Sequence, residues 1–156
     1  MRKLVENTLK EFGYYTPDSA NLVLGTIAQE SAYGKYRKQL GNGPALGIAQ
    51  MEPNTFNDIV TNFLSYRPLI TLAIKKVCGV TELKADDLET NDTLAICMCR
   101  VQYLRFKNPI PTDLAGYAAL WKFRYNTING AGTIVEFIAN YKKYVLPDVI
   151  TQNIQS

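Results

Sequence analysis

Apolar residues along this chain recur every three or four positions, which is the spacing that places side chains on one face of an α-helix. This pattern predicts helices over residues 4–12, 16–33, 53–64, 68–77, 92–105, 112–124 and 132–144. Strand signals are scarce, and the one place that would allow a short β-hairpin is near residues 34–48. We therefore expect a mainly α fold in a single compact domain spanning residues 1–156.

The boundaries of these helices rest on residues that cap or break helices. Thr16 offers a capping hydroxyl, and Pro17 suits the first helical position. Gly79 ends the helix that precedes it, and Pro109 prevents the helix over 92–105 from continuing. That helix is apolar on nearly all sides, so we expect it to lie at the centre of the core.

The composition is that of an ordinary globular domain. The chain has 156 residues, of which 47% are hydrophobic and 20% charged, which is enough for one well-formed core. Its net charge of +3 comes without a dense stripe of Lys and Arg, which argues against a nucleic-acid partner. A mildly basic surface would suit an anionic polymer such as a cell wall, although an ordinary surface excess of lysine accounts for it equally well.

The sequence predicts neither a transmembrane helix nor a secretory signal. No apolar run approaches the ~20 residues of a transmembrane helix, so we expect no insertion into a membrane. The basic opening over residues 1–7 has no uninterrupted apolar stretch, so it does not resemble a secretory signal. If the substrate lies outside the cytoplasm, other proteins would have to deliver the chain to it.

The chain contains no histidine, which excludes the Ser-His-Asp and Cys-His types of nucleophilic catalysis. Cys78, Cys97 and Cys99 lack the spacing of a zinc site, and we interpret all three as buried free thiols. We therefore expect no metal and no organic cofactor, with any chemistry carried by carboxylates, tyrosine, lysine, serine or cysteine.

Glu30 is the first candidate for catalysis. Val23, Ile27 and Glu30 share one helix face, which points into the core and ends in a carboxyl group beside a glycine-rich loop. Burial at the rim of an apolar cleft would raise the pKa of that carboxyl group and suit it to general acid catalysis. A solvated glutamate at a helix end, paired with Lys35 or Arg37, would fit the same pattern.

Two later segments could bind a ligand. In the glycine-rich segment 41–53, Gln50 could hydrogen-bond a sugar. Glu52 stands where the N-terminus of the next helix would keep its carboxylate ionised, and it could equally be a capping residue. The segment 121–132 joins Trp121 to a loop rich in Asn and Gly, which could form a sugar-stacking platform or simply be core followed by a helix end.

Taken together and in order, these segments resemble the motifs of lytic transglycosylases. Gln29-Glu30-Ser31 at a helix end resembles the Glu-Ser motif of that family. The segment 47–55, Gly-Ile-Ala-Gln-Met-Glu-Pro-Asn-Thr, resembles the family's Gly-Leu-Met-Gln-x-x-Pro-x-Thr motif. Goose-type lysozymes and small lysozyme-like proteins of tailed phages look similar as well.

Two further segments carry the same resemblance. The helix over residues 91–104 ends in Tyr103-Leu104 and is similar to the family helix that ends in Tyr-Leu. Tyr125-Asn126 resembles the Tyr-Asn of the family's Ala-Tyr-Asn-Ala-Gly motif. The likeness covers roughly residues 20–140, which is most of the chain.

The resemblance implies a lysozyme-like domain that cleaves peptidoglycan glycan strands between N-acetylmuramic acid and N-acetylglucosamine. It assigns Glu30 as the catalytic acid and base. Substrate binding would fall to Ser31, Gln50, Tyr103, Tyr125 and Asn126. Phage proteins of this kind often lack a signal peptide, which would make the chain a virion-associated protein that acts with other virion proteins.

Three residues depart from the family pattern. Ala49 replaces the usual Met, so one side chain that would pack on the substrate is missing. Arg124 and Thr127 replace the alanines that flank Tyr-Asn. These differences bear on substrate detail more than on the class of reaction.

The resemblance leaves the reaction open. A transglycosylase needs only Glu30, which would protonate the glycosidic oxygen and then help the C6 hydroxyl attack to give a 1,6-anhydro product. An inverting hydrolase needs a second carboxylate about 6.5–9.5 Å away to hold a water, and Glu52 stands where goose-type lysozymes carry an Asp. A catalytically idle virion component that binds glycan is a third alternative, against which Glu30 and Tyr125-Asn126 argue.

Overall fold

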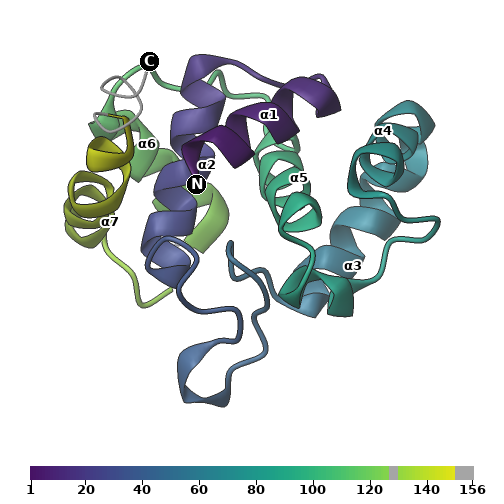
Figure 1. Cartoon of the computed structure of the whole chain (residues 1–156), viewed down its shortest axis with the longest axis horizontal. Helices are drawn as coiled ribbons and strands as arrows, with labels where there is room; N and C mark the ends of the chain where they lie inside the picture. The colour runs from purple at the N-terminus through teal and green to yellow at the C-terminus, as the bar shows by residue number, and fades with distance from the viewer. Residues whose placement is uncertain (127–129, 150–156) are drawn as a thin grey trace.

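The computed structural model describes residues 1–126 and 130–149, which form a compact all-α domain without strands (Figure 1). The predicted mainly α fold is confirmed for this part of the chain. Its helices are α1 (Arg2–Phe12), α2 (Pro17–Ser31), α3 (Pro53–Asn62), α4 (Pro68–Cys78), α5 (Asp92–Leu104), α6 (Leu114–Trp121) and α7 (Ile134–Asn140). Each lies within a few residues of the helix that the apolar spacing predicted.

The hairpin expected near residues 34–48 is reduced to isolated bridges. Leu46 pairs with Lys38 and with Met51, and its N–H donates to Met51 O at 3.0 Å. Gly41 and Gly47 both have positive φ angles, of 79° and 78°, so the chain turns sharply on either side of Leu46. These turns prevent two strands from running side by side for more than one residue pair.

Capping residues set the ends of α2. The Thr16 hydroxyl accepts from Ser19 N–H and the Ser19 hydroxyl accepts from Thr16 N–H, which completes a capping box. The helix ends at Ser31, two residues before the predicted end, because Ala32 and Tyr33 have left-handed φ angles of 51° and 65°. This early end places Glu30 in the last turn of the helix.

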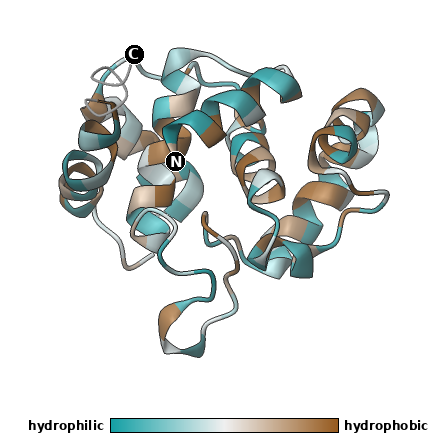
Figure 2. Ribbon diagram, in the orientation of Figure 1, coloured by the Kyte–Doolittle hydropathy of each residue, from teal (hydrophilic) through white to brown (hydrophobic). Residues whose placement is uncertain are grey.

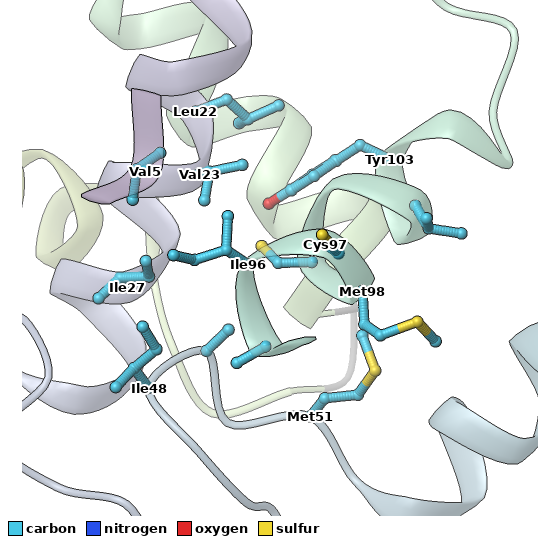
Figure 3. Packing of buried hydrophobic residues seen from close by; sticks show 14 of the residues in the cluster. Val5, Leu22, Val23, Ile27, Ile48, Met51, Ile96, Cys97, Met98 and Tyr103 are labelled. Atoms are coloured by element: carbon cyan, nitrogen blue, oxygen red, sulfur yellow. The ribbon is translucent and has the colours of Figure 1, made fainter. Parts of the chain in front are cut away.

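Helices α2 and α5 form the centre of the core. All residues of α5 from Leu94 to Val101 are buried, as its apolar sequence predicted. Figure 3 shows Val23 and Ile27 of α2 facing Ile96 of α5. Helix α2 also contacts α1, α6 and α7. The carboxyl end of α2 is therefore held from several sides.

Gly25 allows α7 to approach α2 closely. A Cβ atom at this position would lie 2.4 Å from Cζ of Phe137, a fully buried ring of α7. Real carbon atoms do not approach so closely, so a side chain here would push the two helices apart. The glycine thus fixes the spacing between the helix that carries Glu30 and the last helix of the domain.

Both of the last two predicted helices continue into π-helical turns. Helix α6 begins after its cap Asp113 and ends at Trp121, and a π turn covers Lys122–Asn126. Helix α7 is followed by a second π turn over Tyr141–Val145. π turns of this kind are frequent at functional sites. The first one carries the Tyr-Asn pair singled out in the sequence.

The cysteines and the helix lengths add two findings. All three cysteines are free thiols; Cys97 and Cys99 are buried, but Cys78 is only half-buried, because it ends α4 near the surface. Cys78 also lies beside the thiol of Cys97. In the part of the chain that the structure describes, no helix is both long and apolar enough to cross a membrane.

Candidate active site

One cleft of about 620 Å³ opens beside the carboxyl end of α2. Its walls come from four separate parts of the chain: the end of α2, the α2–α3 loop together with the first turn of α3, the end of α5, and the segment around the first π turn. The residues lining it are Gln29, Glu30, Tyr36, Gln39, Leu40, Ala45, Gln50, Met51, Glu52, Thr55, Gln102, Tyr125, Asn126, Gly130, Ala131 and Gly132. The cleft thus gathers Glu30 with four of the other residues singled out in the sequence.

The carboxyl group of Glu30 has a strongly raised pKa. Burial against the core disfavours its charged form and raises its pKa from 4.5 to about 7, while a hydrogen bond from Trp121 acts in the opposite direction. At neutral pH the carboxyl group is therefore present in both its protonated and its ionised form. A group of this kind can donate a proton and later accept one.

Trp121 reaches Glu30 from the end of α6. Its indole N–H donates to Oε1 of Glu30 at 3.0 Å, and the ring itself is fully buried against Phe137. A Cβ atom at Gly132 would lie 2.6 Å from Cη2 of Trp121, so only glycine lets the loop lie this close to the ring. Trp121 is thus a core residue with a polar edge turned to the acid, not a sugar-stacking platform.

Lys122 holds the wall of the cleft that follows Trp121. Its ammonium group donates to Asn126 Oδ1 at 3.0 Å, to Gly130 O at 2.9 Å and to Gly132 O at 2.6 Å. Three acceptors match the three donors of an ammonium group. All three acceptors belong to residues that line the cleft. Sequence reasoning gave Lys122 no role, and its only signal was the four-residue spacing from Asn126.

Tyr125 ties this wall to the loop on the other side of the cleft. Its hydroxyl donates to Ala49 O at 2.7 Å, and its ring stacks on that of Tyr103 with centroids 5.5 Å apart. Tyr103 is itself almost completely buried and shares a hydrogen bond of 2.8 Å with the Thr26 hydroxyl. The stacked pair of Tyr125 and Tyr103 therefore sets the distance between α2, α5 and the π turn.

Gln50 belongs to a tightly fixed turn. It has a positive φ of 49°, and its backbone and side-chain N–H groups both donate to Gly47 O, at 3.1 and 2.9 Å. At Gly47 a Cβ atom would lie 2.2 Å from Leu88 O, so the turn packs directly on the backbone that precedes α5. The amide of Gln50 is thus oriented before any ligand arrives.

Glu52 stands at the start of α3, directly before Pro53. Its side chain makes no capping hydrogen bond to the helix, although the sequence allowed that interpretation. The residue is exposed and lines the cleft. Its carboxylate is therefore accessible to a ligand or to water in the same cleft as Glu30.

Ser31 and Tyr103, which the family resemblance assigned to substrate binding, lie outside the cleft. The Ser31 hydroxyl is fully buried, lies 3.0 Å from Ile27 O and 2.5 Å from Ile48 O, and accepts from Gly34 N–H at 2.9 Å. It joins the end of α2 to the loop that follows. Both residues support the walls from behind because their hydroxyl groups are occupied by neighbours in the core.

No group of three or more His, Cys, Asp or Glu side chains suited to a metal ion occurs within residues 1–126 and 130–149. Thr127, which departs from the family pattern, lies outside the described residues. Comparison of the chain with protein-family models, with curated proteins and with solved structures finds no match. The geometry of the cleft and the motifs of the sequence are therefore what a functional proposal has to rest on.

Proposed function

We propose that this chain cleaves the glycan strands of peptidoglycan, with Glu30 as the general acid and then the general base. The observation that carries the proposal is the state of the Glu30 carboxyl group: burial raises its pKa to about 7 inside a cleft large enough for sugar rings. Rupture of a glycosidic bond needs a proton on the leaving oxygen, and an acid with a pKa near the working pH supplies it most effectively.

The hydrogen bond from Trp121 gives the two carboxyl oxygens of Glu30 different roles. Because Oε1 accepts from the indole N–H, the acidic proton resides on Oε2, which is left for the substrate. After the proton has moved to the leaving sugar, the same indole N–H stabilises the carboxylate that remains. That carboxylate is then the base for the second half of the reaction.

Amide side chains in the cleft support an amino-sugar substrate. Five of them line it: Gln29, Gln39, Gln50, Gln102 and Asn126. Each takes part in a hydrogen bond within the protein, to Asn140, Ala45, Gly47, Arg124 O and Lys122 respectively. Amides offer both donors and acceptors, which suits the hydroxyl and acetamido groups of N-acetylated sugars.

The motif resemblance indicates which glycosidic bond the protein would cleave. Glu-Ser, the Gln-x-x-Pro-x-Thr segment and Tyr-Asn resemble motifs of lytic transglycosylases in the same order, and their residues Glu30, Gln50 and Tyr125 line one cleft here. We therefore propose cleavage between N-acetylmuramic acid and N-acetylglucosamine, in a lysozyme-like fold. Glu52, which lines the same cleft and makes no capping hydrogen bond, is available as the second carboxylate of an inverting hydrolase.

The proposal is tested by digesting purified peptidoglycan with wild type and with Glu30→Gln, and by mass analysis of the soluble products. We expect muropeptides from wild type and less than a few per cent of that rate from the variant. Glu82→Gln is the matched control, because Glu82 is exposed and, among the described residues, its one ion pair is with Lys84. Equal rates for wild type and Glu30→Gln would exclude Glu30 as the general acid.

A protein that only binds glycan gives a different result. Wild type would then release no soluble fragments, and Glu30→Gln would hold insoluble peptidoglycan as firmly as wild type does. Sedimentation with the insoluble polymer measures this binding. It therefore distinguishes a folded, glycan-binding protein without activity from one that does not recognise the polymer at all.

A further inference from the structure

The 3-10 turn after α3 and the helix α4 that follows it expose large apolar side chains. Tyr66 in the 3-10 turn Leu64–Tyr66 is 77% exposed, and Leu69 and Leu72 of α4 are 80% and 64% exposed. Figure 2 shows α4 at the edge of the molecule, with hydrophobic residues among its turns. Three such residues so close together are more than isolated surface leucines.

Leu69 and Leu72 share one side of α4. Leu69, Leu72 and Lys76 follow each other at three- and four-residue steps, so they form a stripe along the helix. The opposite side holds Ile74, the only residue of α4 that is buried. The helix is therefore attached to the domain by one side, and nothing in residues 1–126 and 130–149 covers the other.

A shallow groove continues the apolar surface toward α3. It has a volume of about 390 Å³, and its lining includes Val60 and Leu64 from one side and Leu72 from the other. Lys75 also lines it. We call Tyr66, Leu69 and Leu72, together with the cations Arg67, Lys75 and Lys76, the α4 face.

The charged residues within the α4 face are all cations. Residues 59–81 contain Arg67, Lys75 and Lys76 and no Asp or Glu. The exposed leucines and three cations thus lie in one segment that contains no acidic residue.

We propose that the α4 face docks peripherally on an anionic phospholipid bilayer. Leucines and a tyrosine that project beyond the surface suit the boundary between headgroups and acyl chains, and cations of a single sign suit a uniformly anionic layer. A protein partner is normally met by charges of both signs and by pockets that receive its anchor residues. Residues 59–81 offer no acidic group for such pairing.

The interaction is reversible and does not depend on glycan cleavage. Two leucine side chains are smaller than a myristoyl chain, whose own partition constant of about 10⁴ M⁻¹ already gives only reversible binding. Each cation near an anionic surface strengthens the binding about fivefold. The docking therefore weakens as salt screens the surface charge.

Vesicle sedimentation tests the proposal with the whole chain. Wild type is mixed with vesicles of phosphatidylglycerol and phosphatidylcholine, or of phosphatidylcholine alone, at low and at physiological salt. We expect binding to the anionic vesicles that falls with salt, and little binding to the zwitterionic ones. The double variants Leu69→Gln with Leu72→Gln, and Lys75→Gln with Lys76→Gln, should each lower the partition constant about tenfold or more.

A matched control removes the same kinds of group elsewhere. Val135, Lys142 and Lys143 are exposed on and after α7, so the triple change of these residues to Gln removes an apolar side chain and two cations away from the α4 face. It should bind anionic vesicles at least half as strongly as wild type. Circular dichroism verifies that every variant is folded.

Three outcomes would overturn the proposal. Folded wild type could fail to bind anionic vesicles, or the α4-face variants could bind as wild type does. In the third outcome, wild type is a dimer by light scattering, the leucine variant is a monomer, and neither binds vesicles. That result would assign the α4 face to a second copy of the chain instead.

Discussion

The indole N–H of Trp121 donates to Oε1 of Glu30 across 3.0 Å, and the two residues lie 91 positions apart in the chain. Burial of Glu30 and this hydrogen bond act on the same carboxyl group in opposite directions. Burial is the larger effect, which leaves the pKa at about 7. The pair therefore makes the Glu30 carboxyl group both acidic enough to donate and basic enough to accept near neutral pH.

The raised pKa of Glu30 predicts a stability that depends on pH. The folded protein holds the proton up to about pH 7, whereas the unfolded chain releases it near 4.5, so wild type loses stability between these values as pH rises. The glutamine of Glu30→Gln carries no such proton, so the variant does not lose this stability as pH rises. At pH 8 we expect the variant to be more stable than wild type by about 3 kcal/mol, with little difference at pH 4.

Urea denaturation of both proteins at the two pH values measures this difference. Parallel curves for wild type and Glu30→Gln across the whole range would show that the carboxyl group is solvated in the folded state, and would remove the physical basis for its role as an acid.

Trp121→Phe isolates the hydrogen bond to Glu30. The variant keeps an aromatic ring in the core but removes the N–H that lowers the pKa, so the pKa of Glu30 should rise. Under the proposed function the alkaline limb of the pH–rate profile should then move to higher pH, with kcat reduced about tenfold or more. A lower rate without any shift of the alkaline limb would mean that Trp121 only fills the core and does not set the pKa of Glu30.

Lys122→Met should release one wall of the cleft. The three oxygens that accept from the ammonium group would lose their shared donor, and the segment holding Asn126, Gly130 and Gly132 would no longer be fixed. We expect KM to rise about tenfold while the alkaline limb set by Glu30 stays in place, because Lys122 does not touch that carboxyl group. Steady-state kinetics on soluble glycan fragments separates the two parameters.

Lys122→Arg is the companion variant, since it keeps the positive charge but changes the geometry of the donors. If charge alone mattered, the arginine variant would behave as wild type. We expect it to be intermediate, because a planar guanidinium cannot reach three acceptors arranged around one nitrogen.

Glu52→Gln decides between the two reactions. If water is the nucleophile, loss of the second carboxylate should lower the rate about 10²-fold or more, and the products carry reducing ends. If the C6 hydroxyl attacks, the rate stays within about twofold of wild type and the products carry anhydro ends. Mass analysis identifies the ends, which differ by one water.

The stability of Glu52→Gln should equal that of wild type within about 0.5 kcal/mol, because the structure shows no capping hydrogen bond from this side chain. A loss of about 1 kcal/mol on thermal unfolding would show that Glu52 caps α3 in solution after all.

The sequence by itself determined the helical character of the domain and most of its boundaries. Apolar spacing, Thr16 with Pro17, and Gly79 act through the backbone of their own segment, so their effect can be read without knowing the fold. The sequence also singled out Glu30, because a carboxyl group that ends an apolar helix face is unusual wherever that face packs.

Only the tertiary structure decided which groups surround that carboxyl. Trp121 is the hydrogen-bond donor because of how α6 packs against α2, which no local pattern encodes. Lys122 anchors the neighbouring wall through the π turn that follows, and its four-residue spacing from Asn126 was the only local signal. Ser31 stood next to Glu30 in the sequence but lies outside the cleft, because α2 ends there and its hydroxyl is occupied by Ile27 and Ile48. Neighbours in sequence share a helix axis, whereas a cleft is made by residues from different helices, and their meeting is fixed by packing alone.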